Sequence, residues 1–345
     1  MSHGPKIGMA FIGLGWWGAV LADAALASGK VKVTGGFART PSSREEFVGK
    51  YGGKNFSSID EVMDDSETDA VVIATANSVH KEITIAAARA GKHVHLEKPM
   101  ALSVSDAKEI EQACKDHGVK LHMGQNFRRW PMFRRAKEIV ENGDLGLVNY
   151  TIATFSNNHG FTAGPKSMRW DATENPGGPL YSYTIHLADM MEYLFGDVDE
   201  VSGSCVKVGG PNPQEDAAAA ILRFKSGLMG VISGSYLAPF HFAFDIQGTE
   251  ANLSLSTTEN PTLKRPIDLM GGLETETVEL DHDLVEGRLL ANREQFDDLV
   301  GAIREDRDPE VTGRHGVRAL AIMRAILKSN AERRIVTIEE ILETD

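Results

Sequence analysis

Lys98 is the residue of this chain whose type and position point most directly to chemistry. It lies in the run Glu97-Lys98-Pro99, directly after an apolar, strand-like segment, 92–96. In open parallel sheets, ligands bind beyond the carboxyl ends of the strands. Pro99 has a fixed φ angle and disfavours the α-helical region for Lys98. The backbone that carries the Lys98 ammonium group is therefore restricted. This placement predicts a catalytic lysine, although an ordinary Lys-Pro turn is the alternative when the tripeptide is taken alone.

A glycine-rich turn near the N-terminus predicts dinucleotide binding. The run Gly13-Leu14-Gly15-Trp16-Trp17-Gly18 matches G-x-G-x-x-G between a strand-like segment and a helical one. The first glycine allows a tight turn, the second lets the backbone approach a pyrophosphate, and the third permits close helix–strand contact. The helix N-terminus adds unpaired N–H groups for the anion.

The segment after the second predicted strand favours NADP over NAD. An acidic residue about 20 positions beyond the glycines usually binds the adenosine ribose hydroxyls, but no acid is present in 36–44. Arginines can instead clamp a dianionic 2′-phosphate, and hydroxyls can donate hydrogen bonds to it. The candidates are Arg39, Thr40, Ser42 and Arg44. In the alternative interpretation Arg39 stacks on the adenine and either cofactor is accepted.

The elements that position these residues alternate between strand and helix over the first 125 residues. Strands are expected at 7–12, 30–38, 70–74, 93–96 and 120–123, and helices at 17–28, 42–51, 80–90 and 103–117. Ser103 is a plausible N-cap of the last of these helices. The alternation predicts βαβ units, and hence an α/β Rossmann domain with a parallel, doubly wound sheet, over residues 1–125.

Residues 126–345 are expected to form a second, α+β domain for substrate binding and oligomerisation. Strands at 148–156, 201–208, 217–224, 228–235, 241–248 and 251–256 follow one another with few helices between them. That order is typical of a large, mostly antiparallel, open sheet. Helices are expected at 132–142, 180–195, 288–304 and 316–330, and the last of them can pack on either domain.

Composition restricts the partners and the class of protein. The 345 residues carry a net charge of −13 without a long basic run, which argues against nucleic-acid binding. The two cysteines, Cys114 and Cys205, lack the spacing of a disulfide scaffold or zinc site, so no metal is expected. No signal-peptide pattern and no apolar run of roughly 20 residues is apparent, so we expect a cytoplasmic protein that does not enter a membrane.

Several stretches together resemble the Gfo/Idh/MocA oxidoreductase family, typified by glucose–fructose oxidoreductase and inositol dehydrogenase. The resemblance extends over essentially the whole chain, in 74–80, 90–99, 126–131, 169–171, 177–189 and 310–313. It implies hydride transfer between nicotinamide C4 and a CH–OH or C=O carbon. The implied substrate is a small molecule: a sugar, polyol, cyclitol or related cyclic hydroxy compound. It also implies a homo-oligomer, either a dimer or a tetramer.

The resemblance also implies roles for individual residues. Lys98 and His186 match the acid/base groups of the family. On the cofactor side the implied residues are Thr75, Ala76, Asn77, His80 and Glu97. On the substrate side they are Arg128, Arg169, Ser182 and Asp189. Because residues three or four apart share a helix face, Ser182, His186 and Asp189 can line one wall.

Ser182 departs from the family pattern, in which an acid precedes the histidine by four residues. A serine cannot hold a negative charge, so either His186 and Lys98 carry the proton transfer or a tyrosine substitutes, with Tyr183 the candidate. Packing alone is the other interpretation of Tyr183. His159 and Trp170 lie in a glycine-punctuated stretch, 157–179, and are either pocket residues or ordinary surface loop.

Two other functions remain open for a chain of this family. One is a redox-assisted glycosidase that uses tightly bound NAD(P) transiently. The other is a non-catalytic, dinucleotide-sensing binding protein, against which the presence of both Lys98 and His186 argues. The substrate itself cannot be chosen from acid/base residues alone.

Overall fold

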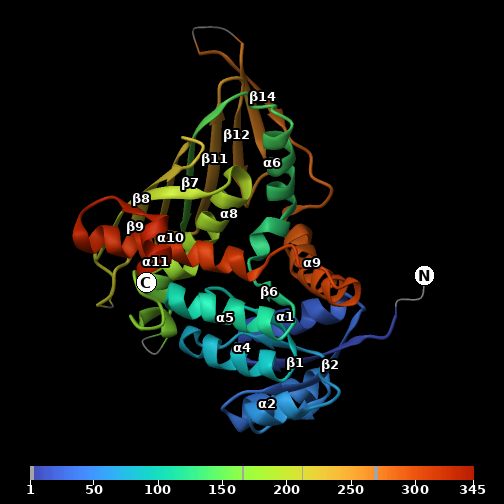
Figure 1. Ribbon diagram of the computed structural model, residues 1–345. Helices are drawn as coiled ribbons and strands as arrows, with labels where there is room; N and C mark the ends of the chain where they lie inside the picture. Colours follow the sequence, from blue (N-terminus) through green and yellow to red (C-terminus); the bar gives the residue numbers. More distant parts are fainter. Residues whose placement is uncertain (1–3, 165–166, 212, 268–270) are drawn as a thin grey trace. The chain divides into compact units, whose positions relative to one another are not determined.

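The computed structural model describes residues 4–164, 167–211, 213–267 and 271–345 (Figure 1). It divides into two compact units. The first comprises Met1–Arg129 and Leu289–Val317, and the second Trp130–Arg288 and Arg318–Asp345. The first unit therefore takes in a late segment of the chain, beyond the residues 1–125 that the sequence assigned to it.

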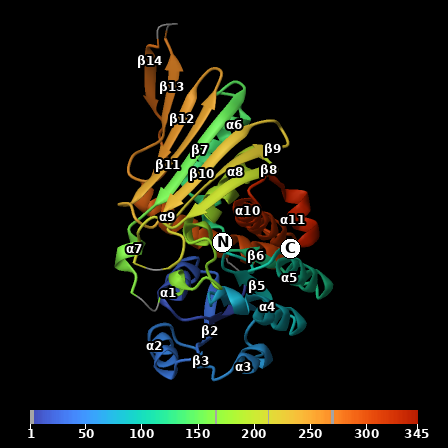
Figure 2. The ribbon, with the colours of Figure 1, turned by 90° about the vertical axis from the view of Figure 1, so that its left-hand side faces the viewer.

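The first unit is built on a six-stranded parallel sheet in the order β3-β2-β1-β4-β5-β6 (Figure 2). Its strands are β1 (Ile7–Ile12), β2 (Val31–Phe37), β3 (Lys54–Asn55), β4 (Ala70–Ile73), β5 (His93–Leu96) and β6 (Leu121–Met123). The chain moves outward from β1 to β2 and β3, and then restarts at β4 on the other side of β1. This reversal of strand order confirms the predicted doubly wound Rossmann sheet.

Helices separate the strands of the first unit, as the alternating pattern predicts, although the short helix at Ile59–Asp64 was not among those expected. They are α1 (Trp16–Ala27), α2 (Pro41–Tyr51), α3 (Ile59–Asp64), α4 (His80–Arg89) and α5 (Val104–Asp116). Ser103 is the N-cap of α5, where its Oγ accepts a hydrogen bond of 3.2 Å from the Asp106 N–H. This confirms the predicted cap and satisfies one of the free donors of the first turn.

One hydrophobic core joins β1, β2 and β4 to α1 and to the part of α9 (Leu284–Glu305) that belongs to this unit. Phe296, Leu299 and Val300 of α9 are fully or almost fully buried against Met9 and Phe11 of β1. Burial of several large side chains stabilises a helix far more than helix propensity alone does. This explains why the late segment folds with the first unit.

The second unit is built on a nine-stranded sheet in the order β14-β13-β12-β11-β7-β10-β9-β8-β15. The strands are β7 (Val148–Ser156), β8 (Val198–Val206), β9 (Ala217–Phe224), β10 (Met229–Ser235), β11 (His241–Gly248), β12 (Asn252–Ser256), β13 (Thr262–Pro266), β14 (Leu273–Thr277) and β15 (Val336–Thr337). Among the described strands of this sheet only β7 and β10 pair in parallel, which confirms the mostly antiparallel sheet.

Helices of the second unit lie against one face of this sheet (Figures 1 and 2). They include α6 (Pro131–Glu141), α8 (Ile185–Phe195), the later part of α10 (Gly313–Glu332) and α11 (Ile338–Thr344). Alternate residues along β9 are buried and exposed. A strand with that alternation has one face on the core and one face free. On the free face Ile221, Val231 and Ile152 lie side by side on adjacent strands.

Two sequence expectations need correction in the second unit. The strand expected at 201–208 covers Val198–Val206, because residues 208–210 turn instead to donate backbone hydrogen bonds to Asp216. The single helix expected at 180–195 begins with one π-helical stretch, Leu180–Thr184, before α8. Such π-turns occur often at functional sites.

Candidate active site

The ends of four neighbouring strands of the first unit lie in one row. In the register of the sheet, paired residues close these strands: Phe37, Ile12, Ile73 and Leu96. The residues after β1, β4 and β5 each donate a backbone hydrogen bond to the last residue of a neighbouring strand, as in Gly13 N–H to Phe37 O at 3.0 Å and Glu97 N–H to Ile73 O at 3.0 Å. The glycine turn and the Lys98 loop therefore leave the same edge of the sheet.

The glycine turn has the geometry that a pyrophosphate requires. Gly13 has φ +96°, and a Cβ there would lie 2.3 Å from the Ala74 carbonyl oxygen. A Cβ on Gly18 would lie 2.1 Å from the Gly13 oxygen, whereas one on Gly15 would meet no atom of the described chain within 4 Å. The first and third glycines are thus fixed by packing, and the second leaves an open approach to the N-terminus of α1.

The N-terminus of α1 provides donors to an anion placed there. Gly15 is its N-cap and, among the described residues, no side chain caps the helix. The first N–H groups of a helix have no intrahelical partner. Trp16 is 78% exposed, and its ring centroid is 5.4 Å from that of Trp17. The turn therefore fits a dinucleotide, with Leu14, Trp16 and Trp17 on its rim.

The two arginines expected at the 2′-phosphate differ in their surroundings. Arg44 Nη1 donates to the Ala38 carbonyl at 2.8 Å, and its Nε donates to Asn55 Oδ1 at 2.9 Å. The Arg39 side chain is exposed and has no side-chain partner within the described ranges. Arg44 thus braces the loop after β2, and Arg39 is the available cation. Thr40 and Ser42 are exposed at the start of α2.

The loop after β4 is joined to the Lys98 loop by His80. Its ring is fully buried, and Nδ1 lies 2.9 Å from the Pro99 carbonyl oxygen. Burial lowers the pKa of His80, so the neutral ring donates its Nδ1–H to that carbonyl. Thr75, Ala76 and Asn77 are half-buried beside it. Contact of these four residues with the nicotinamide stays a prediction. In the structure, the His80 side chain contacts the Lys98 loop and helps to position it.

Lys98 is half-buried, and the loop that carries it is held on both sides. The Glu97 side chain is almost fully buried, and its Oε2 accepts a hydrogen bond of 3.2 Å from the Lys98 N–H. The Lys98–Pro99 peptide is cis. Arg128, expected near the substrate, is buried in a short 3₁₀ turn, Asn126–Arg129, that follows β6. The predicted cofactor-side residues thus lie in the loops, or in the first turns of the helices, that follow β1, β2, β4 and β5.

The helix that carries the predicted substrate-side residues belongs to the second unit. Ser182 lies in the π-turn, and His186 and Asp189 follow on α8. The Ser182 hydroxyl accepts a hydrogen bond of 2.6 Å from Tyr236 and donates one of 3.2 Å to Asn175 Oδ1. The position of the usual family acid is therefore part of a neutral hydrogen-bond network. His186 is half-buried, and Asp189 is 2% exposed.

Tyr183 is paired with His159 through a hydrogen bond between its hydroxyl and Nδ1. Burial raises the pKa of Tyr183 well above its usual value, while burial and the Arg169 charge lower the pKa of His159. The tyrosine is therefore the donor and the histidine the acceptor. Arg169 stands 5.8 Å from the centroid of the Tyr183 ring. The structure brings these three together, and no spacing signal links 159 with 183.

Sequence reasoning missed Asn175 and Tyr236. Both contact Ser182, but Tyr236 follows β10 and is 54 residues away in the chain. Trp170, one of the open candidates, packs edge-on against Tyr236 with centroids 5.5 Å apart. Contacts of this kind depend on how a distant strand end meets a helix, so sequence periodicity does not indicate them.

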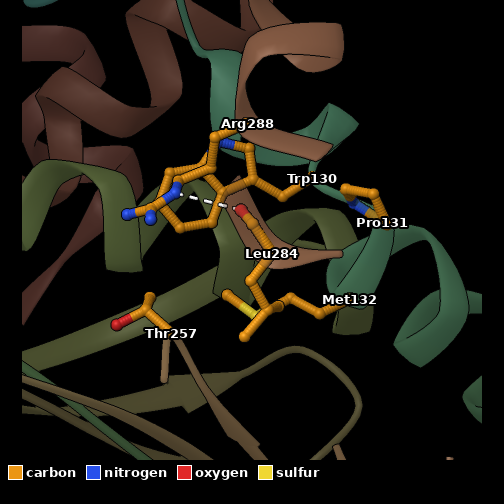
Figure 3. A pocket seen from close by; sticks show the side chains of 6 residues that line it. All are labelled: Trp130, Pro131, Met132, Thr257, Leu284 and Arg288. Atoms are coloured by element: carbon orange, nitrogen blue, oxygen red, sulfur yellow. Dashed lines mark hydrogen bonds between the residues drawn. The ribbon is translucent and has the colours of Figure 1, made fainter. Parts of the chain in front are cut away.

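A small pocket of the second unit is separate from all predicted site residues (Figure 3). Its lining is Trp130, Pro131, Met132, Thr257, Leu284 and Arg288. Arg288 stacks over the Trp130 ring at 5.7 Å and donates to the Leu284 carbonyl at 3.1 Å. The space open to water is about 10 Å³, room for a single water molecule. This pocket is therefore not a sugar site.

Comparison with known families identifies the class of protein. The model described as "Oxidoreductase family, NAD-binding Rossmann fold" matches residues 7–125, and "GFO/IDH/MocA C-terminal domain" matches residues 133–254. The chain belongs to the GFO/IDH/MocA oxidoreductase family, as its motifs predict. It is an NAD(P)-dependent oxidoreductase.

Similar proteins include a 1,5-anhydro-D-fructose reductase from Ensifer adhaerens, 29% identical over 83% of this chain and 85% of the relative. A myo-inositol 2-dehydrogenase from Thermotoga maritima is 29% identical over 82% of this chain and 83% of the relative. A solved structure from Desulfitobacterium hafniense DCB-2, provisionally described as an NADPH-dependent oxidoreductase, superposes with a TM-score of 0.90 at 28% identity. The superposition covers 98% of this chain and 99% of the D. hafniense chain. Within the described ranges, no helix has both the length and the apolar character to cross a membrane.

Proposed function

We propose that this enzyme transfers hydride between NADP and a CH–OH or C=O carbon of a sugar, polyol or cyclitol. The observation that carries the proposal is the position of Lys98 on the same row of strand ends as the glycine turn, with β4 between the two strands that carry them. The relatives named as a reductase of an anhydro sugar and a dehydrogenase of an inositol support this substrate class.

Lys98 and His186 are the proposed acid/base groups. The bound nicotinamide supplies or accepts the hydride. In the reducing direction the carbonyl oxygen gains negative charge, which a positioned ammonium stabilises and an acid neutralises. Lys98 is held by the buried Glu97 and by the His80–Pro99 contact, so little reorganisation is needed. Tyr183 is the second candidate acid, and burial keeps its hydroxyl protonated.

The proposed cofactor preference rests on Arg39. Its exposed guanidinium follows β2, where an acidic residue would otherwise bind the ribose, and Arg44 braces the loop under it. A guanidinium forms bidentate, charge-assisted hydrogen bonds with a phosphate dianion, whereas a neutral ribose hydroxyl offers no such interaction. The D. hafniense structure described as NADPH-dependent supports the same preference.

Absorbance of the reduced nicotinamide tests the proposal. We expect steady consumption of NADPH with keto sugars or keto cyclitols, or of NADP with the alcohols, and higher kcat/KM than with NADH or NAD. Turnover of a glycoside without net change in free NADP(H) would support the glycosidase instead. Dinucleotide binding without turnover of any sugar, polyol or ketone would support the sensor.

We also propose that the chain is a homo-oligomer that pairs through the free face of the nine-stranded sheet. Small and apolar side chains cover the middle of this face, and Ile221 is 48% and Ile152 37% exposed. A second copy of the same face would bury these side chains.

A further inference from the structure

Arg169 is a half-buried cation of the second unit that has no carboxylate partner among the described residues. Its guanidinium carbon lies 5.8 Å from the centroid of the Tyr183 ring. The nearest acid in the sequence, Asp171, is turned to Thr173 instead, and accepts its N–H at 2.9 Å and its hydroxyl at 2.6 Å. An aromatic ring attracts a cation but does not neutralise it. A charge partly withdrawn from water without an anion is therefore left uncompensated.

Other arginines with little exposure are paired with carboxylates of the chain. Three of them make such pairs, at N–O distances of 3.0, 2.9 and 2.8 Å: Arg129 with Asp298, Arg318 with Glu192 and Arg324 with Asp345. Removing one member of a pair of this kind is costly, because the remaining charge stays buried alone. Among these four arginines Arg169 is the exception, and an anion from a ligand would complete its surroundings.

The groups next to Arg169 are hydrogen-bonding but neutral. The Tyr183 hydroxyl donates to His159 Nδ1. Burial raises the pKa of Tyr183 and lowers that of His159, so both side chains are uncharged at neutral pH. After burial, the Arg169 charge is the next influence on both pKa values, and no carboxylate of the described chain contributes to either shift. The surroundings of the cation thus carry no negative charge.

The serine at position 182 explains why this charge is missing. The family pattern has an acid at this position. Ser182 accepts a hydrogen bond of 2.6 Å from Tyr236. The pKa of Tyr236 is raised by burial, while the Ser182 hydrogen bond and then the Arg169 charge lower it. An aspartate at 182 would therefore lie within range of the Arg169 charge, whereas serine leaves that charge unbalanced.

The same hydrogen-bond network holds the backbone of Arg169. Asn175 Nδ2 donates to the Arg169 carbonyl at 3.2 Å and to the Gly178 carbonyl at 2.9 Å, and its Oδ1 accepts the Ser182 hydroxyl at 3.2 Å. Asn175 is itself buried. The cation and the neutral residue at 182 are therefore fixed relative to each other, which lowers the cost of ordering the site when an anion binds.

We propose that the substrate of this enzyme is a sugar acid and that Arg169 binds its carboxylate. A guanidinium and a carboxylate match each other in bidentate geometry. One cation balances one negative charge, which is the charge of a carboxylate, whereas a phosphate ester approaches two at neutral pH. The reaction that this substrate undergoes rests on the proposed function, but the binding of its carboxylate does not.

Equilibrium binding tests the proposal without any need for turnover. The full-length protein with NADP is titrated in a calorimeter with a panel of uronates and aldonates, and with the sugars and alditols that have CH₂OH in place of the carboxylate. We expect an acid of the panel to bind at least roughly tenfold more tightly than its neutral counterpart, and Arg169→Gln to remove that difference. Arg135→Gln, which changes an exposed arginine of α6, is the control and should keep it.

Three results of these titrations would overturn the proposal. The first is that no acid binds more tightly than its neutral counterpart. The second is that Arg169→Gln keeps the preference for the acid. The third is that sugar phosphates bind more tightly than the corresponding carboxylates, since the anion would then be a phosphate.

A charge placed at position 182 tests the same idea in the opposite direction. Ser182→Asp restores a carboxylate within range of Arg169, and Ser182→Asn is the matched variant of the same size without the charge. We expect Ser182→Asp to have at least roughly tenfold lower kcat/KM for the acid than Ser182→Asn, because the new carboxylate competes with that of the substrate. For the neutral counterpart the two variants should agree within about threefold. Equal ratios of acid to neutral substrate in both variants would contradict the proposal.

The two proposals fail in different ways. If the acid binds through Arg169 but no hydride passes to or from NADP(H), the proposed function fails and the carboxylate site stands. If neutral sugars are oxidised or reduced and no acid is preferred, the carboxylate site fails and the proposed function stands.

Discussion

At the scale of single residues, the structure distinguishes an arginine whose donors are used within the protein from one whose side chain is exposed. Arg44 is occupied by the Ala38 carbonyl and by Asn55, whereas Arg39 is exposed. Both were predicted at the 2′-phosphate from their types and positions alone. The structure distinguishes them, because only a fixed backbone shows which guanidinium has its donors already in use.

Arg39→Ala should raise KM for NADPH by roughly 10- to 100-fold, because a charge-assisted hydrogen bond contributes about 1.5–3 kcal/mol. KM for NADH should change by less than about threefold, since its ribose offers no dianion. Steady-state kinetics with both cofactors measure this. Arg89→Ala, which removes another exposed arginine of the same unit, is the control. An equal change for both cofactors would mean that Arg39 stacks on the adenine instead.

At the scale of elements, much of the fold follows from hydrophobic periodicity. The strands at 7–12, 93–96, 148–156, 217–224 and 241–248 were predicted with the bounds that the structure has. Strands β3, β13, β14 and β15 were not predicted; β3 and β15 have two residues each, and β14 is exposed throughout. The Ser182–Tyr236 contact and the Tyr183–His159 pair were not predicted either, because they depend on how distant elements meet.

Asp216 illustrates how one side chain fixes a loop of the second unit. Its buried carboxylate accepts N–H groups of Val208, Gly209 and Gly210, and Lys207 Nζ lies 3.0 Å away. These donors lower the pKa of Asp216 to about 2 although burial opposes them. The ionised form is thus favoured more in the folded chain than in the unfolded chain.

This lowered pKa predicts a pH-dependent stability. Asp216 should stabilise the fold above its unfolded pKa, near 4, and lose that contribution as pH falls toward about 2. At neutral pH Asp216→Asn should therefore destabilise the second unit by roughly 1–3 kcal/mol, and the difference from wild type should shrink below about pH 4. Thermal unfolding of both proteins across this range checks it. A difference that grows on acidification would contradict the assigned sign.

At the scale of the whole molecule, the free sheet face is the feature that a single chain leaves unexplained. A row of side chains crosses it from Ser202 through Ile221, Val231 and Ile152 to Asp245. Three neighbouring apolar side chains at the centre, with polar ones at each end, resemble the anatomy of an interface.

A charge at the centre of this face should therefore dissociate the oligomer. We expect Ile221→Asp to shift the molar mass, measured by light scattering, from that of a dimer or tetramer toward the monomer. An exposed leucine on α1 of the first unit, Leu26, gives the control Leu26→Asp, which should keep the wild-type mass. If Ile221→Asp also keeps it, the copies pair elsewhere or the chain is monomeric.

The central claim is that Lys98 acts on the reacting oxygen, and Lys98→Ala tests it most directly. We predict that kcat falls by roughly 10²- to 10⁴-fold, the usual loss for a positioned acid or base. The Kd for NADPH, measured by titration, should stay within about threefold of wild type. The exposed Lys32→Ala serves as control. A kcat for Lys98→Ala within about twofold of wild type, on a substrate that wild type turns over, would contradict the account.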